Sequence, residues 1–535
     1  MKRIPLLVIL MLAFLPVACE AQNKLVTAPH AAVKPSVPVT GPRQIIVISD
    51  LHMGVGKDVA AKGWDNTEDF RWPLQFGRFL EKIDRDGNGS TDLIIAGDLF
   101  ELWQSREKDC QVGREEDFGC TEDESLDRLN RVIVAHKSEL AALGVFARNK
   151  NNRLIILPGN HDAALLFPKV RDAAFRAIGG GAKVVFIPNG YWLSEDGFIY
   201  VEHGHQIGRE VNKWKNWPTP FLEKEGKRYL QRPWGEKFVQ DYYNRFEIDY
   251  PIIDNFTDER VSIKYARAAE GSGKTVQDVI GFLKFYFFQV SWEQLTASLG
   301  KEKEGFPPEW DNNAIRSQGP GFLAESLPSD HPLASVVREP AGDREKEQLA
   351  ELFKSLTDDE INTICNQRAF ILAKNKEDKV AATVTSCPRT AGSLGAVMQS
   401  ITKTNKKVLG DHMEKDLCPV LPGCMKNPFR VFIYGHTHLR IHPGRLSLSN
   451  GNWKPTFVNS GAWQRVATPD QVKVIRERKS LPKADVLTGL FPEDLPACYT
   501  YLLIKPYETK EELVPILRYW EGEEGKEGVT KEHCK

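Results

Sequence analysis

The chain has 535 residues, of which 41% are hydrophobic, 10% aromatic and 27% charged, and this composition excludes collagen, a coiled coil and wholesale disorder. Its 71 Lys and Arg residues stand against 72 Asp and Glu residues, which leaves a formal net charge of -1. We therefore expect no bulk binding of nucleic acid, because counterion release requires a positively charged surface.

Residues 1–21 have the features of an export signal. Two basic residues precede an apolar run, residues 5–18, that is too short to span a bilayer. Two processing routes remain open: Cys19 becomes the lipidated first residue of a lipoprotein and tethers it to a membrane, or the chain is cleaved after Ala21. Either route predicts export to the periplasm or cell envelope.

The cysteines suit an oxidising compartment, because nine are present and eight remain once Cys19 is set aside. Cys110 with Cys120 and Cys418 with Cys424 are close enough in sequence to form local disulfides. Buried free thiols are the alternative for some of the eight. The sequence gives no connectivity for the other four, which are Cys365, Cys387, Cys498 and Cys534.

Residues 22–42 have no helical or alternating pattern and are interpreted as a flexible linker, so the folded part begins at residue 43. Short apolar runs then recur, each typical of a strand buried on both faces. Helical patterns cover residues 73–83 and 126–146 between the early runs. The six predicted strands are 45–49, 93–97, 154–159, 198–204, 431–435 and 456–461.

Polar residues follow these runs directly, and six of the twelve histidines are among them. Since ligands bind beyond the carboxyl ends of strands in layered α/β folds, residues far apart in the sequence are expected to meet there. Such a cluster of histidines and carboxylates indicates a metal site. The residues are Asp50, His52, Asp98, Asn160, His161, His203, His205, His436, His438 and Asn459.

The stretch 206–430 interrupts the series of strands and is interpreted as a mainly helical insert. Its aromatic stretches, 238–256 and 279–299, predict helices that bury one broad face. The insert either packs over the core or forms a cap that shapes the substrate site. Contact of 279–299 with a membrane surface is disfavoured, because this stretch has no basic polar face.

The motifs D-x-H, GD, GNHD, an isolated His and G-H-x-H, in this order, resemble those of the calcineurin-like metallophosphoesterase superfamily. The resemblance covers residues 43–205 and 429–505. It implies a four-layer αββα sandwich whose core is formed by residues 43–205 and 431–535, the latter ending in a charged tail. SDLHMG and GDLFELW look most like the UDP-diacylglucosamine pyrophosphohydrolases, but that branch commonly has Arg where this chain has His161, so its substrate is not carried over.

Residue by residue, the resemblance implies two divalent metal ions, which the donor types leave open as Mn, Fe or Zn. It also implies that His161 is the catalytic histidine, oriented by Asp162, although a helix N-cap is an equal alternative for Asp162. His203 is preferred to His205 because it directly precedes Gly. The implied ligands are Asp50, His52 and His438 for one metal, Asn160, His203 and His436 for the other, and Asp98 as the bridge.

The charges of such a site agree with phosphoester chemistry. Two divalent cations, Asp50, Asp98 and a metal-bridging hydroxide leave a net charge of about +1 to receive an anionic phosphoryl group. Hydrolysis of a phosphomonoester or phosphodiester by that hydroxide is the predicted reaction, with a phosphorylated small molecule, lipid or nucleotide as substrate. Asn459 is expected to brace the metal loop rather than to bind substrate. Arg440 lies near a motif where it could meet phosphate, but the solvated surface is the preferred expectation.

Two other functions remain as alternatives. A nucleotide pyrophosphatase or cyclic-nucleotide phosphodiesterase would use the same metal ligands. A non-catalytic envelope binding protein would use the scaffold without turnover, although every ligand position is filled.

Overall fold

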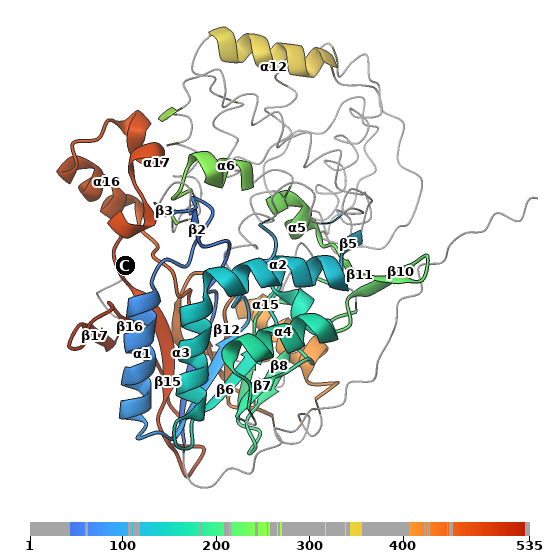
Figure 1. The fold of residues 1–535 in the computed structure, drawn as a ribbon, viewed down its shortest axis with the longest axis vertical. Coiled ribbons are helices and arrows are strands. Elements are labelled where there is room, and N and C mark those ends of the chain that lie inside the picture. The colour runs from blue at the N-terminus through green and yellow to red at the C-terminus, as the bar shows by residue number, and fades with distance from the viewer. Residues whose placement is uncertain are drawn as a thin grey trace, which may run out of the picture.

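A computed structural model describes residues 43–256 with short breaks, residues 343–355, and residues 406–529 with short breaks, together with a few single residues between 265 and 338. Two β-sheets pack against each other at its centre, and helices cover the outer face of the larger sheet (Figure 1). A helical segment packs on the outer face of the smaller sheet. These layers agree with the predicted α/β metallophosphoesterase sandwich.

The larger sheet has seven strands. Its parallel strands β1, β4, β6 and β7 follow one another across the sheet, and β15 joins β1 in the antiparallel sense. In spatial order the strands are β17 (Glu527–Val529), β16 (Pro515–Trp520), β15 (Tyr499–Ile504), β1 (Gln44–Ile48), β4 (Thr91–Ala96), β6 (Arg153–Leu157) and β7 (Val184–Phe186). Unbroken runs of Ile, Leu and Val explain why β1, β4 and β6 are buried on both faces.

The smaller sheet has five strands, and β12 lies parallel to both of its neighbours. In spatial order they are β13 (Ile441–Arg445), β14 (Thr456–Asn459), β12 (Val431–Tyr434), β9 (Ile199–Glu202) and β8 (Tyr191–Leu193). All six strands predicted from the apolar runs are therefore present in the two sheets.

The core between the sheets is built by alternation along each strand. Val47 of β1 packs between the sheets, whereas its neighbour Ile46 packs under the helices. Ile433 and Val458 fill the space from the smaller sheet. The helices that close the other side are α1 (Pro73–Asp86), α2 (Glu122–Ala135), α3 (Lys137–Arg148) and α4 (Pro168–Ile178).

The helical pattern at 126–146 is two helices rather than one, because the chain breaks at His136. The ring of His136 is fully buried, and its two nitrogens lie 3.2 Å from Glu68 and 3.1 Å from Glu139. Glu68 also accepts the backbone N–H groups of Gly54 and Gly56. This tertiary contact overrides the local helical pattern and ties the loop after β1 to the helices.

The described part of the insert is less helical than predicted, because it begins with a hairpin. Strands β10 (Phe221–Lys224) and β11 (Lys227–Gln231) pair with each other and with β5 (Phe118–Thr121). Glu225 and Gly226 both have positive φ, which is the backbone of a two-residue hairpin turn. Helices α5 (Trp234–Phe238), α6 (Asn244–Asp249), α12 (Asp343–Ser355) and α15 (Lys406–Asp411) and the π-helical turn η4 (His412–Leu417) follow. The predicted helix at 279–299 lies outside the described residues.

The remaining elements are short and complete the edges of the sandwich. They are β2 (Lys57–Asp58), β3 (Gly63–Trp64), η1 (Ala163–Leu166), α16 (Pro469–Arg478), η5 (Lys483–Asp485), α17 (Val486–Gly489) and η6 (Pro492–Asp494). Tyr250 and Ile252 of the insert share one apolar cluster with Val472 of α16 and Leu487 of α17. The start of the insert is therefore anchored to the C-terminal part of the chain.

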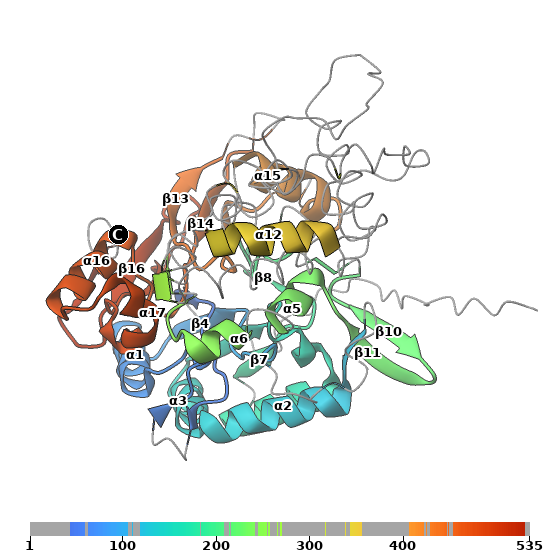
Figure 2. The same ribbon diagram turned by 90° about the horizontal axis from the view of Figure 1, so that it is seen from above.

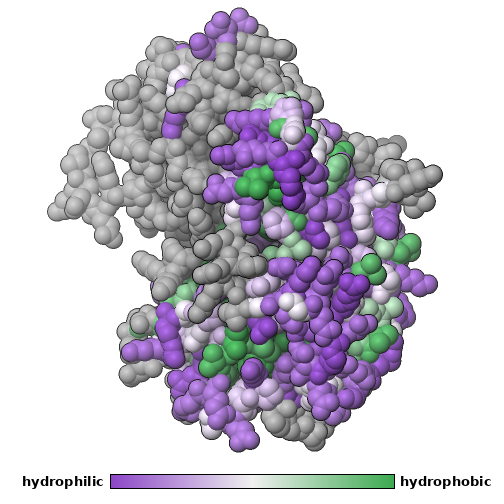
Figure 3. All heavy atoms as spheres, turned by 90° about the vertical axis from the view of Figure 1, so that its left-hand side faces the viewer, coloured by the Kyte–Doolittle hydropathy of each residue, from purple (hydrophilic) through white to green (hydrophobic). Residues whose placement is uncertain are grey.

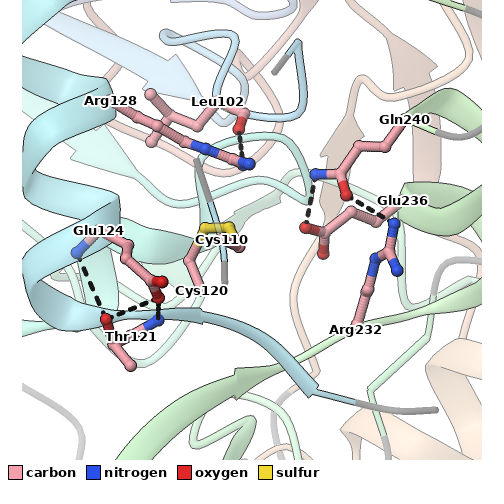
Figure 4. The surroundings of a disulfide bond; sticks show 9 residues. All are labelled: Leu102, Cys110, Cys120, Thr121, Glu124, Arg128, Arg232, Glu236 and Gln240. Atoms are coloured by element: carbon pink, nitrogen blue, oxygen red, sulfur yellow. Dashed lines mark hydrogen bonds between the residues drawn. A yellow bond between two sulfur atoms is a disulfide. The ribbon is translucent and has the colours of Figure 1, made fainter. Parts of the chain in front are cut away.

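Both disulfides expected from local spacing are present. Cys110 pairs with Cys120 and Cys418 with Cys424, at Cα–Cα distances of 5.0 and 5.2 Å. Cys498 is also disulfide-bonded. The first disulfide lies beside the start of α2 (Figure 4).

The surface described on one side of the molecule is mostly hydrophilic, with small hydrophobic patches (Figure 3). Large apolar side chains that are exposed, such as Leu74 of α1 and Val134 of α2, are a minority of the large apolar residues, most of which are buried. Within the described ranges, no helix combines the length and the apolar character needed to cross a bilayer.

The buried contacts of His136 predict a stability that depends on pH. Burial lowers the pKa of His136, but the charge of Glu68 and hydrogen bonds to Glu139 and Glu68 outweigh burial and raise it to about 9. Because this folded-state pKa exceeds the unfolded value of about 6.5, the stabilisation is complete below about pH 6.5 and is lost as the pH rises through about 9. We expect wild-type protein to lose roughly 2–3 kcal/mol of unfolding free energy between about pH 6 and pH 10, relative to His136→Gln. Urea unfolding at both pH values measures this difference, and equal losses in the two proteins would contradict the assignment.

Candidate metal centre

The polar residues that follow the parallel strands meet at one edge of the two sheets. Seven side chains belong to this cluster: Asp50 and His52 follow β1, Asp98 follows β4, Asn160 follows β6, His203 follows β9, and His436 and His438 follow β12. This edge is where the carboxyl ends of the strands open, as expected for a ligand site in such a fold.

The backbone turns sharply at most of these positions. Asp50, His52, Asp98, His436 and His438 all have positive φ, between 51° and 68°. Residues with a side chain rarely adopt this left-handed backbone, and such strain concentrates at functional sites. The turns let side chains two residues apart, such as Asp50 and His52, face the same space.

Asp50, His52 and His438 form one group of ligand atoms, all within 4.8 Å of one another. The Nε2 atoms of His52 and His438 are 3.1 Å apart, and His438 Nε2 lies 3.6 Å from Asp50 Oδ1. The Nδ1–H of His52 donates to Glu101 at 2.9 Å, which leaves its Nε2 lone pair for the group. Two imidazoles and a carboxylate thus point at one position.

Asp98, His203 and His436 form a second group of the same kind. His203 Nδ1 donates to the Ala96 carbonyl at 2.9 Å, so its Nε2 faces Asp98 Oδ2 and Asn160 Oδ1, both also at 2.9 Å. A neutral His203 would place three lone pairs together, an arrangement that requires a cation between them. The two groups are joined by Asp98, whose Oδ2 also lies 3.6 Å from His52 Nε2.

The charges of the site attract cations. Burial lowers the pKa of His203, but the charge of Asp98 outweighs burial and raises it to about 9. Burial lowers the pKa of His436 to about 3 and that of His438 well below its usual value, so both imidazoles offer neutral nitrogens. Carboxylate, imidazole and amide donors of this kind fit divalent ions such as Mn, Fe or Zn.

Glycines beside the ligands leave room for this convergence. A Cβ on Gly159 would lie 2.1 Å from Asp98 Oδ1, and one on Gly435 would lie 2.6 Å from Asp50 Oδ2. Gly97 has φ +90°, and a Cβ there would meet the ring of His203 at 2.5 Å. At these positions only glycine lets the backbone approach the ligand side chains.

His161 lies at the rim of the centre and is 18% exposed at its side chain. Its Nδ1 is 2.5 Å from Glu101 Oε2, and its ring stacks on Trp103 with centroids 4.0 Å apart. The ring meets His52 edge-on at 4.5 Å. Because Nδ1 is held by a carboxylate, the proton that His161 can exchange with a ligand is at Nε2.

The expectation that Asp162 orients His161 is wrong in this structure. The carboxylate of Asp162 accepts backbone N–H groups from Gly159, Asp98, Leu99 and Phe100, and Glu101 holds the imidazole instead. Nor does the Asp162 side chain cap η1, the alternative role. It joins the loop after β6 to the loop after β4, which places both loops at the metal centre.

Glu101 is a site residue that sequence reasoning missed. Its Oε2 accepts both His52 and His161, and its Oε1 accepts the backbone N–H groups of Trp103 and Gln104. Burial raises the pKa of Glu101, but the charge and hydrogen bond of His161, followed by those of His52, lower it to about 2. The available signal was an acidic residue three positions after Asp98, within GDLFELW.

Two further candidates lie around the centre. His205 is buried behind His203, and its ring meets Trp217 edge-on at 4.3 Å; it belongs to neither ligand group. Asn459 donates to the Gly435 carbonyl and to Thr437, so it braces the loop between His436 and His438 as expected.

Residues 43–258 match the family model of the calcineurin-like phosphoesterases. The match confirms the superfamily predicted from the motifs and indicates that the protein is a phosphoesterase hydrolase. This family typically uses divalent metals, in agreement with the groups of candidate ligands at this centre, which also include His52, Glu101 and His161. A search among curated proteins gives no match to this chain.

The position of Glu101 predicts that its charge matters for turnover. Replacing Glu101 by Gln keeps the shape of the side chain but removes the charge that orients His52 and His161. We expect kcat on a phosphoester to fall by about 10- to 100-fold, the usual effect of losing such a partner. Glu493→Gln, which neutralises a partly exposed carboxylate, serves as the control and should retain wild-type kcat. Wild-type kcat in Glu101→Gln, with metal content unchanged, would contradict this role.

Proposed function

We propose that this calcineurin-like phosphoesterase hydrolyses phosphomonoesters or phosphodiesters at a centre of two divalent metal ions. Asp50, His52 and His438 would hold one ion, and Asn160, His203 and His436 the other. Asp98 would bridge them, because its Oδ2 lies 3.6 Å from His52 Nε2 and 2.9 Å from His203 Nε2. This position of Asp98 between the two groups is the observation that carries the proposal.

When bound, the two ions would polarise the phosphoryl oxygens, and they would also lower the pKa of a bound water so that hydroxide is available near neutral pH. The chain supplies the rest of the chemistry. The carboxylates of Asp50 and Asp98 carry two negative charges, which would neutralise half of the charge of two divalent ions. Both carboxylates are nearly inaccessible to solvent, so water would screen this attraction little. The remaining positive charge favours an anionic phosphoryl group over a neutral ester.

His161 is the group that exchanges a proton with the substrate. Glu101 accepts the Nδ1–H of His161. In the imidazolium form, the second proton, at Nε2, can then pass to the leaving-group oxygen or form a hydrogen bond to a phosphoryl oxygen. Trp103 stacks on the ring and fixes its plane. A general acid placed in this way typically contributes about 10²- to 10⁴-fold in rate.

The insert contacts the loop that carries Trp103, the residue on which His161 stacks. Helices α5 and α6 lie above the central strands in Figure 1, and in Figure 2, which is seen from above, they are drawn in front of those strands. Asn244 of α6 donates to the Trp103 carbonyl at 3.3 Å, and Gln104 donates to Glu247 at 3.3 Å. These contacts support both roles expected of the insert, packing over the core and shaping the substrate site as a cap.

A panel of phosphomonoesters, phosphodiesters, nucleoside diphosphates and cyclic nucleotides tests the reaction. We expect metal-dependent hydrolysis of at least one class, and the class hydrolysed separates a phosphomonoesterase from a nucleotide pyrophosphatase or cyclic-nucleotide phosphodiesterase.

Asp98→Ala should lose both metal and turnover, since Asp98 lies between the groups. His161→Ala should keep its metal while its kcat falls by about 10²- to 10⁴-fold. Wild-type turnover in both variants would overturn the assignment, and no hydrolysis of any ester by metal-loaded protein would favour a binding protein.

We further propose that the mature protein resides in the periplasm or cell envelope and acts on phosphorylated small molecules, lipids or nucleotides there. The disulfides Cys110–Cys120 and Cys418–Cys424 support an oxidising compartment, because cytosolic thiols are normally kept reduced. A lipid on Cys19 would add a membrane tether.

The mature N-terminus decides between the processing routes. If Cys19 is lipidated, the protein should sediment with membranes and Cys19→Ser should release it to the soluble fraction. If cleavage follows Ala21, wild-type protein should be soluble, with residue 22 as its first residue by mass spectrometry. Recovery from the cytosol with residues 1–21 still attached would contradict export.

A further inference from the structure

A cluster of buried polar side chains joins the insert to helix α2 beside the metal centre (Figure 4). Glu236 of α5, Arg232 just before α5 and Arg128 of α2 are 3%, 4% and 6% exposed. Gln240 connects two of them, because it donates to Glu236 Oε1 at 2.9 Å and accepts a hydrogen bond from Arg232 at 2.7 Å. The reaction described above uses none of these groups.

This cluster borders Trp103, on which the ring of His161 stacks. Arg128 donates to the carbonyl of Leu102, the residue before Trp103. From the insert, Asn244 donates to the carbonyl of Trp103 itself. The segment that carries Glu236 is therefore attached to the same loop that positions the proton-exchanging histidine.

The carboxylate of Glu236 lies within electrostatic reach of His161. Figure 4 shows it pointing away from α5, toward the side on which Arg128 and Leu102 lie. Burial raises the pKa of Glu236, and the charges of Arg232, Arg128 and, more weakly, His161 oppose this rise. Such an effect requires proximity, because Coulomb energies fall with distance. A leaving group that receives its proton from His161 is thus close to Glu236.

One oxygen of Glu236 has no hydrogen-bond donor. Gln240 binds Oε1, whereas Oε2 is buried and accepts no hydrogen bond from any residue of the described ranges. A buried carboxylate oxygen without a donor is unfavourable. Protonation would not satisfy it, because the added O–H would then lack an acceptor. Solvent does not reach Oε2, so the donor is expected from a bound molecule.

The groups around Oε2 define the chemistry of that donor. Asn244 Oδ1 is also buried without a donor among the described residues, so this part of the insert offers hydrogen-bond acceptors. The positive charges of Arg128 and Arg232 act on the carboxylate and would repel an ammonium group. A neutral hydroxyl meets no such repulsion and forms a strong, charge-assisted hydrogen bond with a carboxylate.

We propose that Glu236 Oε2 accepts a hydrogen bond from a hydroxyl group on the leaving group of the substrate. The proposal rests on the phosphoester hydrolysis proposed above and narrows the substrate class to phosphate esters of polyols, such as sugars or glycerol. Glu236 is thus a specificity-determining residue that the insert contributes, on the side of the site where His161 lies.

Calorimetric titration of metal-loaded protein with two matched pairs of non-hydrolysable phosphonates tests this assignment. In the first pair, 3,4-dihydroxybutylphosphonate imitates glycerol phosphate and butylphosphonate lacks its hydroxyl groups. In the second pair, the phosphonate analogue of glucose 6-phosphate is compared with 2-cyclohexylethylphosphonate. We expect wild-type protein to bind the hydroxylated member of at least one pair about 10- to 100-fold more tightly, as a hydrogen bond to a charged group allows.

Substitutions assign that preference to Glu236. Glu236→Gln should remove most of it, because a neutral amide oxygen is a weaker acceptor than a carboxylate. Glu223→Gln is the matched control, since it removes the same charge from an exposed position of the insert hairpin, and it should keep the full preference. If Glu236→Gln does not fold, as judged by circular dichroism, Glu236→Asp keeps the negative charge but withdraws the carboxylate, and it should lose the preference as well.

A merely structural role of Glu236 would weaken the binding of both members of a pair equally and leave their ratio unchanged. The inference is therefore overturned by a folded Glu236 variant that keeps the full preference, and equally by wild-type protein without a preference in either pair. Failure of the proposed function is detected separately, with p-nitrophenyl phosphate as the substrate for hydrolysis. Hydrolysis without the preference refutes only the role of Glu236, and the preference without hydrolysis of any ester refutes only the reaction.

Discussion

The site depends on the convergence of lone pairs around Asp98. Oxygen atoms of Asp98 and Asn160 lie 2.9 Å from the same nitrogen of His203, and that nitrogen has no proton to share if the ring is neutral. Only a cation makes this arrangement favourable, whether it is a proton or a metal ion. The same requirement explains why the surrounding backbone adopts left-handed turns and why glycine is needed at Gly159, where any side chain would displace Asp98.

Two buried carboxylates outside the ligand groups hold this arrangement in place, by different means. Among the described residues, Asp162 accepts backbone N–H groups and joins the loops that follow β4 and β6. Glu101 binds side chains, and its Oε2 connects His52 in the first ligand group to His161 at the rim. Asp162 therefore fixes the loops, and Glu101 fixes the imidazole rings. The orientation of His161 thus depends on the same carboxylate as the orientation of the candidate ligand His52.

Helix α2 and the insert both form hydrogen bonds with the loop that follows Glu101, and this loop forms one wall of the site. Arg128 of α2 donates to the Leu102 carbonyl at 2.6 Å, and the Cys110–Cys120 disulfide lies beside this contact (Figure 4). From the other side, Asn244 of the insert donates to the Trp103 carbonyl. The wall against which His161 stacks is thus held by a core helix and by the insert together, which links the position of the insert to the geometry of the reaction.

The sequence alone determined the strands and the ligand types, because buried strands need unbroken apolar runs and their ends carry the polar residues. It also predicted the superfamily and both local disulfides. Other features depend on contacts between residues far apart in sequence, and only the tertiary structure shows these. Glu68 contacts His136 where the helical pattern breaks, and Glu101 rather than Asp162 holds His161. Neighbours in sequence such as His161 and Asp162 point apart because each side chain follows its partners in space, and no local pattern encodes those partners.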